Sequence, residues 1–192
     1  MLYNINNIVK GAPNMPPKTR ITKEMILDAA FEITRCSGIS NLSARTISKA
    51  LDCSTQPIMY NYPSVDGIRR DVQRKADEFH MRYIMKPSGR FGQPLLEIAA
   101  SYVRFASEEP HLFRLLFQTE KFSVQSVEEL INEEAFRPVL ENLAASLKSD
   151  IKRAKEYFFA KYLMIHGLAS LVADKAIGYD EKLILNILLG TD

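Results

Sequence analysis

The amino-acid sequence predicts an all-α protein. Apolar residues recur every three or four positions over most of the 192 residues. Capping residues, glycines and prolines separate these periodic stretches, as expected at helix ends. No stretch shows the alternation of apolar and polar residues that indicates a half-buried strand.

The first predicted helix has clear signals at both ends. Thr22 is a good N-cap, and Ile21 can pack against Ile26 four positions into the helix. Gly38 supplies the left-handed conformation that often ends a helix. The apolar stripe between these ends consists of Ile26, Leu27, Ala30, Phe31 and Ile33.

Two short helices are predicted next. Ser43 caps the first of them, and the polar tetrad 52–55 ends it after two turns. Ser54 caps the second, which tolerates Pro57 in its first turn and ends before Pro63. Two short helices joined by a turn and supported by a longer helix form a helix-turn-helix. The positions expected to face inward are Ile47, Ala50 or Leu51, Ile58 and Tyr62.

A longer helix is predicted to follow Ser64, with Asp66 favourably placed in its first turn. It is about five turns long, enough to connect two lobes. Its stripe consists of Ile68, Val72, Ala76, Phe79 and Tyr83. Pro87, Gly89, Gly92 and Pro94 mark the loop after it. Further helices are expected at 94–107, 110–117, 127–148, 154–177 and 180–189.

These elements suggest three segments. Residues 1–20 are expected to form a flexible arm, because prolines stand there among asparagines without any periodicity. Residues 21–65 are expected to form the helix-turn-helix domain, and residues 66–192 a second helical domain. Either Met1 or Met15 could be the start of the protein.

Composition and charge exclude several classes of protein. No apolar run approaches the roughly 18 residues of a membrane span, and the N-terminus lacks the features of a secretory signal, so we expect a cytoplasmic protein. Cys36 and Cys53 have no metal-binding spacing and are expected to be reduced, and neither a metal ion nor a cofactor is expected. Residues 1–64 carry seven basic and four acidic side chains, a weak bias toward a polyanionic partner.

Residues 20–68 resemble the DNA-binding domain of the tetracycline-repressor (TetR/AcrR) family. The stretch ITKEMILDAAFEITRCSGISNLSARTISKALDCSTQPIMYNYPSVDGI carries the resemblance. The matching features are Ala29 and Ala30, Ser43-Ala44-Arg45, Ile47, Cys53-Ser54, and the Ile58-to-Tyr62 stretch followed by Pro63-Ser64. In addition, His166-Gly167-Leu168 is similar to part of the dimerisation helix of one ligand-binding subgroup.

Three positions depart from the family pattern. Family members usually carry glycine and threonine in place of Gln56 and Pro57, and a phosphate-contacting tyrosine in place of Met59. Tyr60 is adjacent and could replace that tyrosine. The resemblance implies a homodimeric transcriptional regulator, a repressor that a small-molecule effector releases from a palindromic double-stranded DNA operator.

Candidate DNA contacts follow from the helix-turn-helix. The first turn of its second helix enters the major groove, where Gln56 can pair with adenine and Thr55 or Pro57 can pack on a thymine methyl. The phosphate-contact candidates are Ser43, Arg45, Ser54, Tyr60, Asn61, Lys18 and Arg20. A solvated first turn is the alternative explanation for Thr55 and Gln56, and helix capping alone would explain both serines.

Two further sets of residues belong to the C-terminal helices. The dimer-interface candidates are Ala160, Met164, Gly167, Leu171, Leu183, Ile184 and Ile187. The effector-pocket candidates are Tyr102, Phe105, Phe113, Phe117, Tyr157, Phe158, Tyr162 and His166. Ordinary packing within one subunit would also explain both patterns, with His166 as a hydrogen-bonded interior group.

An enzyme is not expected, because the sequence has no nucleophile, phosphate-loop or zinc-hydrolase motif, and Glu128-Glu129 and Glu133-Glu134 fit solvated helix faces. A helical protein-interaction module without DNA affinity is the remaining alternative, because Gln56, Pro57 and Met59 depart from the family pattern. The sequence does not indicate the effector, the operator, the regulated genes, or whether they are repressed or activated.

Overall fold

The computed structural model describes residues 20–86, 88–119 and 137–190, and within these ranges all regular elements are helices. This confirms the predicted all-α class. The helices are α1 (Lys23–Ser37), the short 3-10 helix η1 (Ile39–Asn41), α2 (Ala44–Ala50), α3 (Thr55–Asn61), α4 (Val65–Ile84), α5 (Pro94–Glu108), α6 (Pro110–Phe117), α8 (Arg137–Leu147), α9 (Ile151–Ala173) and α10 (Glu181–Leu189).

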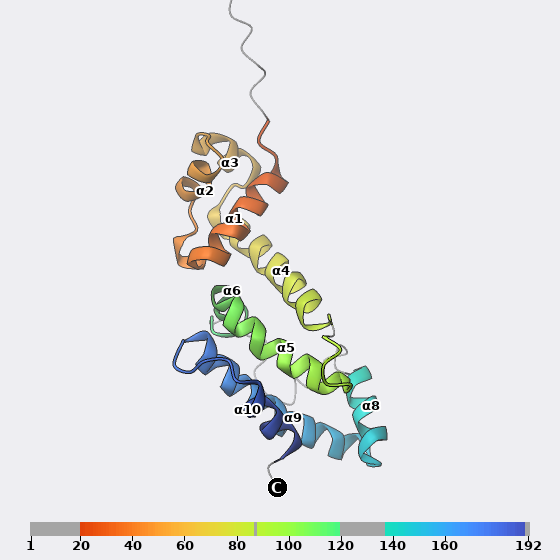
Figure 1. The fold of residues 1–192 in the computed structure, drawn as a ribbon. Helices are drawn as coiled ribbons and strands as arrows, with labels where there is room; N and C mark the ends of the chain where they lie inside the picture. Colours follow the sequence, from red (N-terminus) through yellow and green to blue (C-terminus); the bar gives the residue numbers. More distant parts are fainter. Residues whose placement is uncertain (1–19, 87, 120–136, 191–192) are drawn as a thin grey trace, which may run out of the picture.

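The helices form an elongated molecule with a head and a body (Figure 1). The head consists of α1, α2 and α3, and α4 runs from it toward the body. The body consists of α5, α6, α8, α9 and α10, in which α9 packs against both α5 and α8. No helix in the described ranges is long and apolar enough to cross a membrane.

Side-chain caps start several helices at the predicted residues. Thr22 Oγ1 accepts a hydrogen bond from the backbone NH of Met25 at 3.2 Å, and Ser43 forms a reciprocal capping box with Thr46. Ser54 precedes α3, but its hydroxyl makes no capping hydrogen bond, contrary to our expectation. The extended backbone at Ser54 and the proline in the first turn of α3 set that helix start instead.

One continuous core runs through the head and the body. In the head, Leu51 packs partly against this core and Ala50 is exposed, which resolves the alternative left open by the sequence. Ile68, Val72 and Ala76 on α4 are fully buried, and Phe79 and Tyr83 pack against the core, as the predicted stripe required. The fully buried apolar residues of the head are Ile26, Ala30, Ile47 and Ile58.

The ends of α9 differ from the sequence prediction of 154–177. The helix begins earlier, at Ile151, because the side chain of Asp150 accepts a hydrogen bond from the backbone NH of Arg153 at 2.8 Å. It ends earlier, at Ala173, because Lys175 takes a left-handed conformation with φ 59°. The backbone NH groups of Lys175 and Ala176 then bond to the carbonyls of Val172 and Leu171, a Schellman motif without glycine.

The helix expected at 127–148 is described from residue 137, and its residues 127–136 lie outside the described ranges. A Schellman motif also ends this helix. Lys148, at φ 50°, is its left-handed residue, and the NH groups of Lys148 and Ser149 bond to the carbonyls of Ala145 and Ala144. The predicted helices 94–107, 110–117 and 180–189 are present within one or two residues at each end.

A charged pair joins the head to the body. Arg35 at the end of α1 donates two hydrogen bonds to the carboxylate of Glu109, between α5 and α6; the Nε bond is 2.8 Å. Glu109 is buried, whereas Arg35 is partly exposed and lies over the ring of Phe79 at 5.3 Å. This fork arrangement is both strong and directional.

Removing either partner should destabilise the protein, but unequally. We expect Arg35→Met to lower the free energy of unfolding by about 2 to 3 kcal/mol, because it leaves a buried carboxylate without its cation. Glu109→Gln should lower it by about 1 kcal/mol, because the half-exposed guanidinium can hydrate. Urea unfolding at pH 7 measures both, and equal losses would contradict this account.

Candidate functional site

The turn between α2 and α3 depends on one backbone conformation. Asp52 has a left-handed φ of 47°, and the backbone NH groups of Asp52 and Cys53 bond to the carbonyls of Lys49 and Ser48. This is again a Schellman arrangement, here with an aspartate at the position that usually holds glycine. The turn redirects the chain into α3, as the predicted polar tetrad 52–55 required.

The inner face of α3 is fixed by burial. Ile58 is fully buried and Tyr62, just after the helix, is nearly so. The Tyr62 hydroxyl donates a hydrogen bond to Asp71 Oδ2 on α4 at 2.9 Å, and Lys23 Nζ on α1 lies 3.6 Å from the same oxygen. Burial, and then the hydrogen bond to Asp71, raise the pKa of the Tyr62 phenol above its ordinary value. The end of α3 is therefore tied to both α1 and α4.

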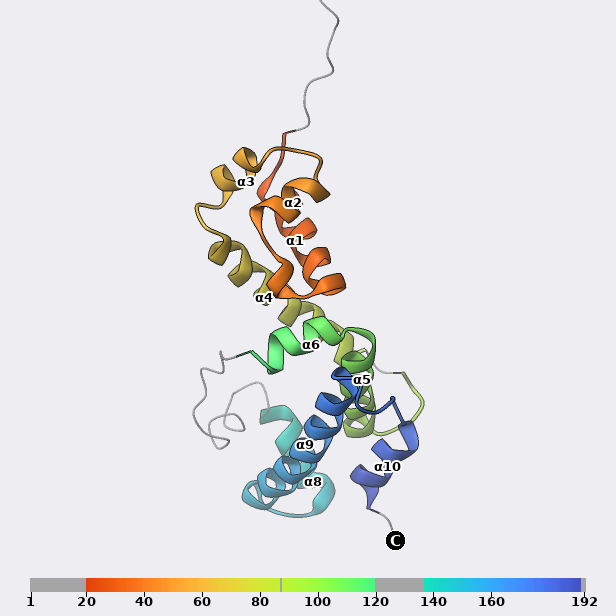
Figure 2. The same ribbon diagram turned by 90° about the vertical axis from the view of Figure 1, so that its left-hand side faces the viewer.

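With that face buried, the first turn of α3 points outward. Thr55 and Gln56 are exposed, and Pro57 is half-buried. Figure 2 shows α3 at the end of the molecule that lies away from α8 and α10. The three base-contact candidates are thus placed where a duplex could approach them.

The phosphate-contact candidates differ in what else they do. Arg45 and Ser54 are exposed, and Tyr60 is 84% exposed. The hydroxyl of Ser43 already accepts a hydrogen bond from the backbone NH of Thr46 at 3.1 Å. The amide of Asn61 donates to the Pro57 carbonyl at 2.8 Å, so part of that side chain is already used.

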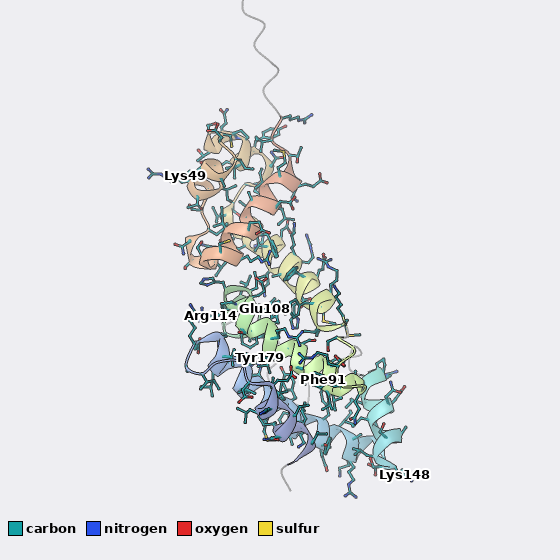
Figure 3. The ribbon with its side chains drawn as sticks, viewed as in Figure 1. Lys49, Phe91, Glu108, Arg114, Lys148 and Tyr179 are labelled. Carbon is teal, nitrogen blue, oxygen red and sulfur yellow. The ribbon has the colours of Figure 1, made fainter. Side chains whose placement is uncertain are left out.

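Two of the candidates lie in the expected arm. Arg20 is exposed at the beginning of the described residues, and Lys18 lies outside them. Lys49 was not among the expected phosphate contacts. It is exposed on α2, four positions after Arg45, and projects away from the head in Figure 3. The spacing of four to a second basic residue was the available signal.

An aromatic cluster fills the body between α5, α6 and α9. The hydroxyl of Tyr102 and Nδ1 of His166 are hydrogen-bonded at 2.9 Å. The rings of Phe113 and Phe117 are 5.0 Å apart, centre to centre, and each lies 6.0 Å from the His166 ring. Four of the eight effector-pocket candidates therefore meet in one place.

The other four candidates lie at the margins of this cluster or beyond it. Tyr162 stacks on His166 at 5.7 Å, and Phe158 stacks on Tyr162 at 6.3 Å. Phe105 faces α4 instead, 5.3 Å from the Tyr83 ring. The hydroxyl of Tyr157 donates to the carbonyl of Leu188 on α10 at 3.4 Å, which directs this side chain away from the cluster.

His80 was not among the residues expected at a site. It lies on α4 beside the predicted apolar stripe and is only 5% exposed. Its ring lies 5.7 Å from Tyr102, 4.8 Å from Phe105 and 5.1 Å from Phe117. Burial in this apolar surrounding lowers the pKa of His80 to about 4, so the imidazole is neutral near pH 7.

Within the described ranges, no three histidine, cysteine or acidic side chains gather in a way that could hold a metal ion. Cys36 is exposed, Cys53 is half-buried, and both are free thiols.

The chain is similar to known proteins in both sequence and structure. No family model matches the chain. Over 181 residues the chain is 25% identical to a Bacillus subtilis (strain 168) protein named uncharacterized HTH-type transcriptional regulator YobS, with 88% of each protein covered. The crystal structure of the multidrug binding protein EbrR complexed with imidazole superposes with a TM-score of 0.52 at 19% identity, covering 86% of this chain and 87% of EbrR.

A TetR-family structure from Streptomyces coelicolor A3 superposes with a TM-score of 0.50 at 20% identity and covers 86% of this chain and 95% of its own. The chain has the fold of the TetR family. The resemblance found in residues 20–68 is thereby confirmed as a fold and extends through the C-terminal helices.

In this TetR-family fold, α9 and α10 carry an exposed apolar surface. Met164 is 45% exposed and Leu171 is 50% exposed, and the apolar Leu163, which the sequence analysis did not name, lies beside Met164. Ala160, Gly167 and Leu183 are also exposed. Space is open around the Cα of Gly167, which would permit close approach of another helix.

Two interface candidates on α10 face the core of their own chain. Ile184 is fully buried within its own chain, and Ile187 is half-buried against the same core. Both lie on the face of α10 that packs on the body, so neither matches the surface position that we expected. The exposed residues that we take as the candidate interface are Ala160, Leu163, Met164, Gly167, Leu171 and Leu183, and we call this set the α9 surface.

The depressed pKa of His80 makes stability depend on pH. In the unfolded chain this imidazole gains its proton near pH 6.5, but in the folded chain only near pH 4, so the unfolded state binds more protons between these values. Acidification from pH 7 to 5 should therefore remove about 2 kcal/mol of stability through His80.

Urea unfolding of the wild type and of His80→Phe at both pH values measures this contribution. The variant should lose less stability than the wild type on acidification. His111→Phe, at a half-exposed histidine, is the control and should behave as the wild type does. Parallel losses in all three proteins would contradict the assignment to His80.

Proposed function

We propose that this chain is a sequence-specific DNA-binding transcriptional regulator, a repressor that a small-molecule effector releases. The observation that carries the proposal is the orientation of α3. Burial of Ile58 and Tyr62 leaves Thr55 and Gln56 exposed at the first turn, which is the part of a recognition helix that contacts base edges. The resemblance to a protein named as an HTH-type transcriptional regulator supports the same reading of the head.

The proposed contacts divide into two kinds. Gln56, Thr55 and Pro57 would contact bases, and the exposed basic residues Arg45 and Lys49 on α2 would hold phosphates. Ser43, Ser54, Tyr60, Asn61, Lys18 and Arg20 remain candidates for phosphate contacts. No catalytic role is proposed for any residue. The alternative is a helical interaction module without DNA affinity, and a measurement of DNA binding distinguishes the two.

We further propose that the regulator is a homodimer formed through the α9 surface. One recognition helix contacts only a few base pairs, and a two-fold dimer places the second helix about 34 to 36 Å away on a palindromic operator. Large apolar side chains exposed together on one face, with small residues among them, are suited to a self-complementary interface.

Release by an effector requires that a conformational change in the body alters the position of the head. The effector must bind the DNA-incompetent arrangement of the two heads more tightly than the competent one. Two routes connect the aromatic cluster to the head. The first route is α4, which carries His80 and packs against α1. The second is α6, which carries Phe113 and Phe117 and begins directly after Glu109, the partner of Arg35.

DNA binding should separate the two kinds of contact. Gln56→Ala should weaken binding to the selected operator by about 1 to 3 kcal/mol and relax the preference at one base pair. Arg45→Ala should weaken binding to all sequences alike and reduce the salt slope by about one. The charge-matched control is Arg82→Ala, at an exposed arginine near the far end of α4. It should leave the operator preference, the affinity and the salt slope unchanged.

Operator selection followed by gel shifts at two salt concentrations gives both results. If Gln56→Ala keeps the wild-type sequence preference, this residue does not contact a base. If the wild-type protein binds no duplex in the selection, the interaction-module alternative replaces the regulator.

The dimer prediction concerns the most exposed large apolar residue of the α9 surface. Leu171→Lys should convert the dimer to a monomer at micromolar concentration, because it places a charge where apolar surfaces meet. Met81→Lys alters another exposed apolar residue, on α4, and should leave the dimer intact. Light scattering coupled to size exclusion measures both variants. A wild-type monomer, or a dimer unaffected by Leu171→Lys, would contradict the proposed interface.

A further inference from the structure

One ring nitrogen of the buried His80 side chain has no hydrogen-bond partner among the residues that the structure describes. This Nε2 atom is inaccessible to solvent and makes no hydrogen bond in the structure. Leaving a buried polar nitrogen unpaired is unfavourable, and such groups usually have a partner or a functional reason to lack one. A leucine or phenylalanine at this position of α4 would avoid that penalty while filling the same core.

The titratable rings of the aromatic cluster carry no net charge near neutral pH. Burial raises the pKa of the Tyr102 phenol and of the Tyr162 phenol, and it lowers the pKa of His166. Each of these groups is therefore held in its uncharged form. A formal charge on a ligand inside this cluster would meet no opposite charge among these rings and would lose its hydration.

A groove on the surface adjoins the aromatic cluster at Phe117. It has a volume of about 430 Å³ and lies between α4 and α6. Its lining residues are Arg70, Gln73, Arg74, Asp77, Leu116 and Phe117. Phe117 belongs to both sites, because it lines the groove and also packs on His80 with 5.1 Å between ring centres. Displacement of this one side chain would join the groove to the unpaired nitrogen.

The charges at the groove largely offset one another. Arg74 donates to Asp71 at 2.9 Å, and Asp77 lies in the same wall as Arg70. The groove thus gives no strong preference for an anion or a cation, whereas the rings beneath Phe117 favour an uncharged, planar molecule.

We propose that the aromatic cluster binds an uncharged aromatic compound whose ring NH or OH group hydrogen-bonds to His80 Nε2, entering from the α4–α6 groove as Phe117 moves aside. This site specifies the effector class of the regulator proposed above. Binding itself requires no DNA, so it is measured separately from DNA binding.

Three probes with one ring system test the proposal. Indole is uncharged, tryptamine carries an ammonium group and indole-3-acetate carries a carboxylate. The chain contains no tryptophan, so indole fluorescence can be followed in the full-length protein without interference from that residue. We expect saturable binding of indole at up to millimolar concentration, and weaker binding of both charged probes. No saturable indole binding, or tighter binding of either charged probe, would overturn the proposal.

Variants locate the contact. His80→Phe should weaken indole binding about tenfold, because it keeps a ring and removes the nitrogen. His111→Phe is the matched control and should bind as the wild type does. Indole affinity unchanged by His80→Phe overturns the assignment. The same variant should be at least as resistant to urea at pH 7 as the wild type, because an unpaired buried nitrogen is gone.

A spectroscopic measurement on the wild type removes any dependence on how the variant folds. In histidine-labelled protein, the ring nitrogen resonances of His80 should shift on addition of indole, and those of His111 should not. Shifts confined to His111, or absent from His80, would refute the site. Gel shifts without indole report DNA binding on their own, so failure of this site and failure of the regulator assignment are distinguishable.

Discussion

The burial of two side chains, Ile58 and Tyr62, determines what the head can do. Both face the core from α3 or its end, and the hydroxyl of Tyr62 is held by Asp71 on α4. With that face fixed, the helical repeat leaves Thr55 and Gln56 on the outside, at the end of the helix suited to base contacts. The direction of the proposed contacts is thus set by hydrophobic packing within the head, before any DNA is present.

Much of this architecture could be predicted from the sequence, because its signals are local. Thr22 and Ser43 cap helices as expected, and α6 begins with Pro110, the first residue of the helix expected at 110–117. The prediction failed where the stop signal was unusual. The end of α9 is set by Lys175 in a left-handed conformation, and a lysine in a charged stretch gives no indication of that backbone geometry.

The candidate sites were predicted less completely, because a helical period shows which residues share a face but not what covers that face. Leu183 and Ile184 are neighbours of similar character, yet one is exposed and the other is buried within its own chain. Tyr157 and Tyr162 both lie on α9, yet only Tyr162 stacks on His166. His80 was missed because an isolated histidine beside an apolar stripe gives no sign of how deeply it will be enclosed. Such distinctions depend on tertiary packing.

The hydrogen bond between Tyr62 and Asp71 also limits where the head and body of two such proteins can be recombined. The first half of α4 supplies both that carboxylate and the buried Ile68, so it completes the head although it lies beyond residue 65. Beyond Ala76, the same helix contributes His80 to the body. A hybrid protein that joins the head of one chain to the body of another would therefore keep the packing of both parts intact only if the splice falls within α4, between these two stretches, and not at the helix start.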